Sequence, residues 1–165
     1  MKPPMQRFGF MTKQAKAGTP FFVWMNTTRM HIFTHIRPEY HEKSGMPGND
    51  YADGMWEHDQ DVGKLLKALD DLGVKDTIVI YSTDNGPNMF TWPDAAMTPF
   101  RSEKDSNWEG AFRVPAMIRW PGYIKPGVWS NQLVSGLDWF PTLLAAAGDP
   151  TVKDRLLKGW AASWG

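Results

Sequence analysis

The 165-residue chain contains no cysteine. It can therefore form neither a disulfide nor a thiolate metal site, and no cysteine can serve as a nucleophile. An excess of charge of one sign is also missing, because 18 basic and 18 acidic side chains give a formal net charge of zero. A neutral chain has no global field to attract nucleic acid or an anionic membrane. Any anion must be bound by a local group of side chains.

Long apolar runs are absent as well. No stretch approaches the roughly 20 apolar residues that span a bilayer, and residues 1–19 lack the apolar centre of a signal peptide. We therefore predict no membrane segment and no nucleic-acid partner. With 42% hydrophobic and 22% charged residues, the composition is ordinary for a folded globular protein.

The stretch Thr77–Gly86 contains the most informative local pattern. Its apolar residues 78–81 predict a central strand that is covered by helices on both faces. Asp84 and Asn85 follow at the carboxyl end, which is the edge where open α/β sheets bind ligands, and Gly86 permits a tight turn. Hard oxygen donors of this kind favour Ca²⁺ or Mg²⁺. A plain turn with no ligand stays an alternative, because Asp-Asn-Gly is also a common turn sequence.

A strand, a loop and a helix are predicted before this stretch. Phe21–Met25 is a compact aromatic and aliphatic run that indicates a second central strand, whereas residues 1–18 indicate a loop or weak helix. Apolar positions recur at helical spacing over Asp50–Leu72, with Asn49 or Asp50 as the cap and Gly73 as the stop. This order predicts a right-handed parallel crossover.

Three further elements are predicted in the second half of the chain. Val114–Trp120 reads as a third strand, Asp138–Ala147 as a capped helix that ends at Gly148, and the tail after Pro150 as a short helix. The strands and helices together predict an α/β fold.

A histidine-containing loop follows the first predicted strand. His31 and His35 have the spacing of a zinc pair, but a pair needs a helix to place both rings on one face, and this segment lacks helical character. A single histidine in a polar loop can donate a proton to a leaving group near neutral pH. The alternative is a histidine that is hydrogen-bonded to the backbone for structural reasons.

A second polar loop, residues 99–115, lies between the strand predicted before Asp84 and the one predicted at Val114. The Lys104 ammonium can reach an anion held over Asp84 and Asn85, and it would act as a point charge on phosphate or sulfate oxygens. An ordinary surface lysine is the alternative. Glu109 and Arg113 stand four residues apart and are predicted to pair with each other.

Several motifs match one family when they are taken together and in order. They are Asp84-Asn85-Gly86, Phe100-Arg-Ser-Glu-Lys104, Trp108-Glu-Gly-Ala-Phe-Arg-Val-Pro115, Trp120-Pro-Gly122 and Asp138-Trp-Phe-Pro-Thr-Leu-Leu144. This series resembles the type I sulfatases, specifically the bacterial arylsulfatases of the alkaline phosphatase superfamily. The resemblance runs from about Pro20 to about Gly159.

The resemblance implies a fold and a set of roles. The fold would be part of an alkaline-phosphatase-like sandwich, with a mostly parallel central sheet flanked by helices. Residues 20–150 would form a partial catalytic domain, preceded by an irregular segment, 1–19, and followed by a tail, 151–165. In the family, the Asp-Asn pair ligates Ca²⁺, the loop lysine contacts the sulfate group, and a histidine lies near the leaving-group oxygen. These roles carry over to Asp84 and Asn85, to Lys104, and to His31, with His35 as the second choice.

One departure from the family concerns the nucleophile. The family makes formylglycine from the first residue of a Cys/Ser-x-Pro-x-Arg motif, and this sequence has no cysteine and no serine that begins such a motif. The resemblance thus implies a sulfuric ester hydrolase segment that acts on a small sulfate ester or a sulfated glycan and is inactive by itself. Alternatives are a related phosphodiesterase or phosphonate hydrolase, and a non-catalytic remnant that binds an anion or a partner. Unpaired sheet edges would favour self-association.

Overall fold

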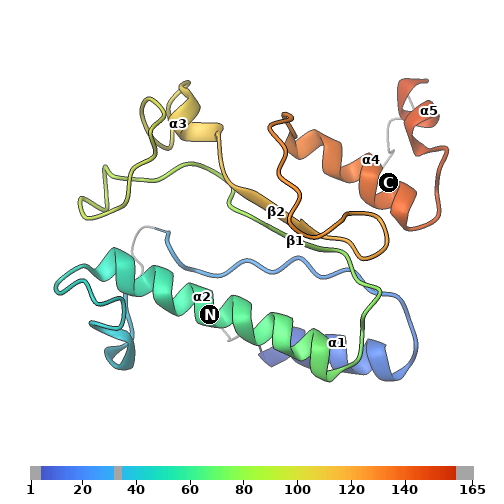
Figure 1. Ribbon diagram of the computed structural model, residues 1–165, viewed down its shortest axis with the longest axis horizontal. Coiled ribbons are helices and arrows are strands. Elements are labelled where there is room, and N and C mark those ends of the chain that lie inside the picture. Colours follow the sequence, from blue (N-terminus) through green and yellow to red (C-terminus); the bar gives the residue numbers. More distant parts are fainter. Residues whose placement is uncertain (1–4, 32–34, 159–165) are drawn as a thin grey trace, which may run out of the picture. The chain divides into compact units, whose positions relative to one another are not determined.

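The computed structural model describes residues 5–31 and 35–158, which fall into two compact units, Met1–Pro126 and Gly127–Gly165 (Figure 1). The elements of the first unit are α1 (Met5–Lys16), the 3₁₀ turn η1 (Pro38–Tyr40), α2 (Asp50–Asp71), β1 (Val79–Ser82), α3 (Glu109–Phe112) and β2 (Ala116–Arg119). The second unit contains α4 (Gly136–Ala146) and α5 (Val152–Leu157).

The longest element, α2, confirms the helix predicted over this stretch. Its cap is Asn49, whose Oδ1 accepts a hydrogen bond from the Ala52 amide at 2.7 Å. Gly73 follows the helix with a φ of +66°, a conformation that glycine adopts without steric cost. Asp53 and Glu57 lie on the buried face of α2, so this helix buries charge as well as apolar surface.

The sheet contains β1 and β2, which pair antiparallel with Val79 opposite Arg119 and Ser82 opposite Ala116. Strands were predicted at both places, and both form. The burial of β1 was predicted wrongly, because its residues are half-buried or exposed rather than covered on both faces. Within the described residues, these are the strands of the one sheet, so the mostly parallel sheet is not confirmed.

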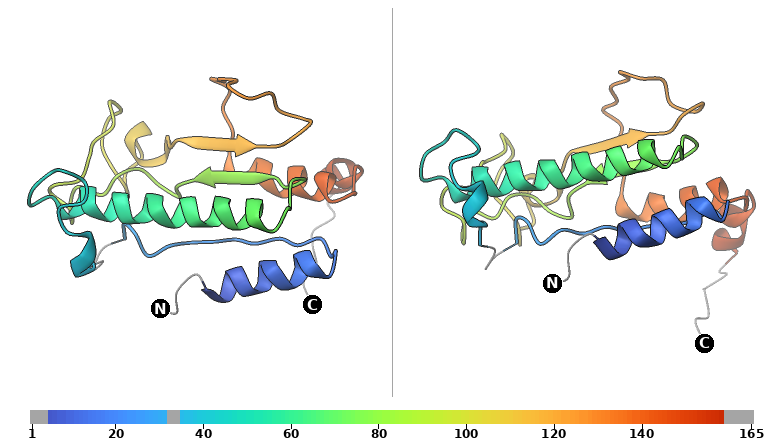
Figure 2. Two further views of the ribbon diagram at one scale, coloured as in Figure 1. Left: turned by 60° about the horizontal axis from the view of Figure 1, so that its bottom comes forward. Right: turned by 90° about the horizontal axis from the view of Figure 1, so that it is seen from below.

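The strand predicted over Phe21–Met25 is wrong. This run has no strand assignment and forms an extended segment that leads from α1 to the turn before His31 (Figures 1 and 2). Alternate side chains are exposed along it, including Phe22 (66%) and Trp24 (73%). The run has the period of a strand, but no strand of the described chain pairs with it. The predicted parallel crossover therefore does not form here either.

The apolar core of the first unit is small. Residues 1–18, predicted as a loop or weak helix, contain the helix α1, and its Met11 is 2% exposed. The other buried apolar side chains of this unit are Ile36, Leu69 and Ala111. Polar contacts therefore position much of the unit. None of its described helices combines the length and apolarity of a membrane span.

The second unit confirms the two helices predicted there. Helix α4 begins at Gly136, two residues earlier than predicted, because Ser135 and Asp138 form a capping box at its start. Helix α5 follows Pro150, and Arg155 forms an ion pair with Asp149. Trp160 and Trp164 of the tail lie outside the described residues.

Candidate functional site

The loop after β1 presents two oxygen-bearing side chains. Asp84 is exposed and Asn85 is half-buried, and both follow the carboxyl end of the strand. The Asn85 Nδ2 donates to the Gly86 carbonyl at 2.9 Å, so Oδ1 is the atom of this carboxamide that can serve as a ligand. Consecutive residues after the strand thus supply a carboxylate and a carboxamide oxygen, which are donor types that suit a hard cation.

Two glycines allow the backbone of this loop to contact the loop that carries Lys104. A Cβ on Gly86 would lie 1.7 Å from the Gly110 carbonyl oxygen, and a Cβ on Gly110 would lie 1.9 Å from that of Ser102. The Gly86 amide donates to the Ala111 carbonyl at 2.7 Å. The sequence suggested Gly86 for a tight turn, but the structure requires glycine there because two backbones approach closely.

Lys104 lies in the loop that these contacts hold in place. Its amide donates to the Pro87 carbonyl at 2.9 Å, and its side chain is half-buried. A cleft of about 410 Å³ lies here, lined by Asn88, Phe90, Thr91, Ser102, Glu103, Lys104, Asp105 and Ser106. Lys104 is the cationic member of that lining. The structure thus ties the backbones of the predicted anion-binding and metal-binding loops together.

The arginines of the Lys104 loop are engaged with neighbouring rings. Arg101 lies over the Trp108 ring at 3.6 Å, and Arg113 lies over the Phe100 ring at 4.1 Å. Arg113 also pairs with Glu109 at 3.5 Å, which confirms the pairing predicted from their spacing. These contacts give the arginines roles in the loop's own structure.

His31 is positioned by another element, α2. We define residues 27–31 as the histidine turn, in which the His31 amide donates to the Thr28 carbonyl at 3.1 Å. The Arg29 Nε donates to Glu57 at 2.8 Å, and the Thr27 hydroxyl lies 3.0 Å from the His58 ring. His31 is exposed, as is His35, the second choice from the sequence. The side chains of Thr27 and Arg29 thus attach the histidine turn to α2.

Sequence reasoning missed the polar residues of α2 that do this positioning. Glu57 is 2% exposed and binds two arginines, Arg29 at 2.7 Å and Arg37 at 2.6 Å. A buried carboxylate between two guanidinium groups is satisfied by charge-assisted hydrogen bonds. The available signal was that Asp53 and Glu57 share one helix face, being four residues apart, but their partners lie in segments distant along the chain.

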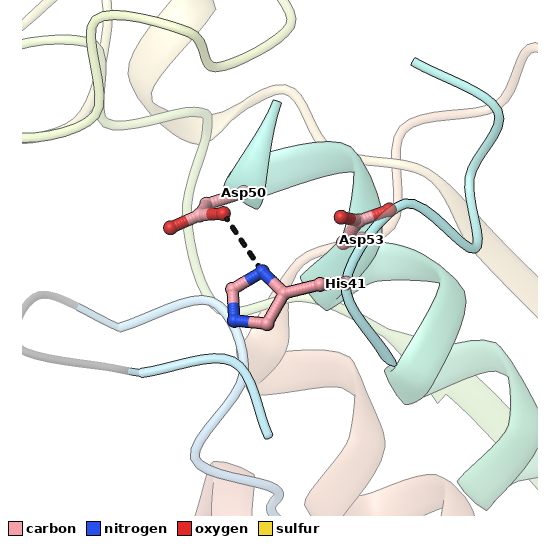
Figure 3. A group of neighbouring side chains, drawn as sticks. All are labelled: His41, Asp50 and Asp53. Carbon is pink, nitrogen blue, oxygen red and sulfur yellow. Dashed lines mark ion pairs between the residues drawn. The ribbon is translucent and has the colours of Figure 1, made fainter. Parts of the chain in front are cut away.

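A second polar cluster lies at the start of α2, where one ligand atom from each of His41, Asp50 and Asp53 lies within 4.8 Å of the others (Figure 3). The two Asp53 oxygens accept hydrogen bonds from the Glu42 and Ser44 amides at 2.6 and 2.8 Å. These bonds, led by the one from Ser44, lower the pKa of Asp53. The geometry therefore makes Asp53 the anchor of the preceding loop.

Comparison with known proteins identifies the family. The sulfatase family model matches residues 7–149. This chain belongs to the sulfatase family. The sulfatase chain is 35% identical to human arylsulfatase A over 142 residues, which is 85% of this chain and 27% of that protein. It is 34% identical to mouse N-acetylgalactosamine-6-sulfatase over 153 residues, which is 91% of this chain and 29% of that protein.

A solved structure shows the same relationship. The sulfatase PsFucS1 from Pseudoalteromonas sp. superposes with a TM-score of 0.79 at 32% identity, covering 87% of this chain and 28% of that one. The resemblance seen in the sequence motifs is therefore confirmed, and the sulfatase α/β fold is the fold of these neighbours. The chain spans between 27% and 29% of the length of the two curated relatives named above.

Proposed function

We propose that this chain contributes the sulfate-contacting and cation-contacting part of a sulfatase site, and that the reaction served is hydrolysis of a sulfate ester. The main support for this proposal is the close contact between the backbones at Gly86 and Gly110, which holds the Lys104 loop against the Asp84 loop. Family membership supports the reaction class. The finer features, including arylsulfatase specificity and calcium assistance, are parts of this proposal.

The donor set at the end of β1 fits calcium in kind. Asp84 and Asn85 offer hard oxygen atoms, and the Asn85 amide nitrogen is turned toward Gly86. Calcium usually takes six to eight oxygens, so these two side chains alone give weak affinity. Magnesium is the second candidate for the same donors. A bound cation would withdraw charge from the sulfuryl oxygens as a Lewis acid.

Lys104 and His31 have separate roles in the proposal. The Lys104 ammonium would neutralise charge on the sulfuryl oxygens from the cleft that it lines. The His31 imidazole would donate a proton to the leaving-group oxygen as the ester bond to sulfur breaks. The nucleophile of the family, formylglycine, has no precursor motif in this sequence. We therefore expect the chain alone to turn over little or no ester.

The sulfatase relatives support a sulfate ester as the substrate class. A small aryl sulfate and a sulfated glycan both present the same tetrahedral anion to a lysine point charge. A phosphate ester presents a similar anion, so a phosphodiesterase or phosphonate hydrolase is the competing activity. The sheet of the described residues has two strands, and its outer edges would allow association with a second copy or with another chain.

Calorimetry on the purified chain tests this proposal. We expect weak Ca²⁺ binding that Asp84→Ala abolishes, with Asp76→Ala as the matched control because it removes an exposed carboxylate before β1 instead of after it. Unchanged Ca²⁺ affinity in Asp84→Ala would contradict the ligand assignment. A chromogenic aryl sulfate should give no turnover, and measurable turnover would show a different hydrolytic site.

The anion is tested in the same way with inorganic sulfate and phosphate. We expect Lys104→Met to weaken sulfate binding several-fold, in line with the loss of one charge-assisted contact of roughly 1.5–3 kcal/mol that is partly screened by solvent. Lys125→Met is the control, because Lys125 is an exposed lysine away from the cleft. A clear preference for phosphate would favour the competing phosphoryl activity.

A further inference from the structure

The imidazole ring of His58 links three separate segments of the first unit. His58 lies on α2 and is half-buried. Its Nδ1 lies 3.0 Å from the Thr27 hydroxyl in the histidine turn, and its Nε2 lies 3.1 Å from the Tyr81 hydroxyl in β1. The His58 and Tyr81 rings are also in contact, with centroids 5.8 Å apart. One side chain thus joins the turn that carries His31 to the strand that leads to Asp84.

The contacts of the Thr27 hydroxyl support placing the proton on one particular ring nitrogen of His58. This hydroxyl donates to the Arg29 carbonyl at 3.1 Å, so its single hydrogen is already used. With that hydrogen on Arg29, the hydroxyl accepts toward His58, which assigns the donor role in this 3.0 Å contact to Nδ1. In a neutral ring, Nε2 is then the acceptor, and it receives the hydrogen of the Tyr81 hydroxyl. In this arrangement, each polar hydrogen of the three side chains has an acceptor.

We propose that His58 is a positioning residue for the candidate site, and that it ties the histidine turn to β1 through a neutral ring with its proton on Nδ1. The role of His31 in this statement rests on the proposed function. The physical linkage does not, because it concerns hydrogen bonds that exist without substrate or metal. The adjacent Glu57 reinforces the link by binding Arg29 of the same turn.

The charged groups around the ring are consistent with a neutral state at pH 7. Burial lowers the pKa of His58, against the opposing charges of Asp61 and Asp59 on the same helix. The histidine turn contributes the charge of Arg29, which is paired with Glu57. From β1, the facing titratable group is Tyr81, whose pKa burial raises, so it keeps its hydroxyl hydrogen.

Nitrogen-15 NMR of the full chain at pH 7.5 tests the proton position, with His58→Gln used to assign the resonances. We expect the shift of a protonated Nδ1 and an unprotonated Nε2 in the wild type. Thr27→Val removes the acceptor and should move the proton to Nε2, where the Tyr81 hydroxyl can accept it. A purely space-filling histidine would not respond in this way. A wild-type proton on Nε2 would overturn the proposal.

Amide hydrogen exchange tests the linkage itself. Tyr81→Phe should speed exchange of the His31 amide about fivefold, which corresponds to one net hydrogen bond of about 1 kcal/mol. Tyr51→Phe is the matched control, since it removes a hydroxyl from a half-buried tyrosine of α2 whose ring contacts Trp92 rather than His58. Unchanged exchange at His31 in Tyr81→Phe would overturn the linkage.

Two safeguards keep the outcomes separate. If Tyr81→Phe unfolds the chain, exchange will rise throughout α2, and the wild-type proton position, which needs no substitution, then decides the proposal. Failure of the proposed function would be seen in calorimetry, as absent Ca²⁺ and sulfate binding in a chain whose NMR and exchange results are unchanged. The NMR and exchange results are independent of both ligands.

Discussion

Close backbone contact makes Gly110 one of the least replaceable residues of the candidate site. A Cβ there would lie 1.9 Å from the Ser102 carbonyl oxygen, and that oxygen belongs to the backbone of the Lys104 loop. We expect Gly110→Ala to lower the free energy of unfolding by about 3 kcal/mol or more, because the loops must separate. Urea denaturation followed by circular dichroism measures this loss.

A second glycine provides the control for that substitution. Gly63 lies inside α2 and has open space around its Cβ position. Gly63→Ala should raise the free energy of unfolding by about 0.5–1 kcal/mol through better helix propensity. Equal effects of the two substitutions would show that the close backbone contact does not constrain the fold.

Acid sensitivity is expected from Asp53. Hydrogen bonds from the Ser44 and Glu42 backbone lower its pKa from the ordinary value of 3.8. A lowered folded-state pKa stabilises the protein fully above the unfolded value, and that stability is lost as the pH falls through the folded value. We expect unfolding to become easier below about pH 4, measured as urea midpoints between pH 7 and pH 2.5.

The variant Asp53→Asn isolates this contribution. Its carboxamide has one oxygen and cannot accept from both amides with the same strength, so it should be less stable at pH 7 and should lose part of the acid dependence. Asp71→Asn is the control, because Asp71 forms an exposed pair with Lys67 that contributes little. An identical pH dependence in Asp53→Asn and the wild type would contradict the anchor role.

At the scale of elements, α2 carries His58 and the two buried carboxylates, Asp53 and Glu57. Its cap is a single side chain, Asn49, and the expected cost of Asn49→Ala is about 1 kcal/mol in the free energy of unfolding. Asn49→Asp should restore most of that loss, because a carboxylate also caps well. Thermal and urea unfolding of the pair measures the difference. No recovery in Asn49→Asp would indicate that the contact from Asn49 to the Asp94 carbonyl matters more than the cap.

Elements that depend on nearby residues were predicted correctly, whereas those that depend on distant residues were not. Helix α2 and its cap depend on residues close in sequence, and they were predicted almost to the residue. The run Phe21–Met25 has the composition of a strand, but a strand also needs a partner, and partner choice depends on distant residues. The same limit explains why the pairing of β1 with β2 was not predicted as antiparallel.

At the scale of the whole molecule, unpaired sheet edges are the most consequential feature. The sheet of the described residues has two strands, so each has one edge that no other strand of that sheet covers. Exposed apolar residues such as Met117 (60%) add to this edge. We expect concentration-dependent self-association in sedimentation velocity, reduced by Met117→Lys because charge on an edge strand opposes pairing.

A matched variant tests whether the edge is responsible. Met97→Lys introduces the same charge at a residue that is 52% exposed and lies outside both strands. It should leave association unchanged if the strand edge mediates the contact. If the wild type stays monomeric across the concentration range, the edge of β2 is not an interface.

The family and most of the helices could be read from the sequence alone. The order of five motifs from Asp84 to Leu144 indicated a sulfatase, and the helix periods and caps depend on neighbouring residues. Strand pairing, the need for glycine at Gly86 and Gly110, and the contacts of Glu57 and His58 with the histidine turn became visible in the three-dimensional arrangement. The physical reason is range, because propensity and capping act within a few residues, whereas pairing, close packing and buried ion pairs join residues far apart in the chain.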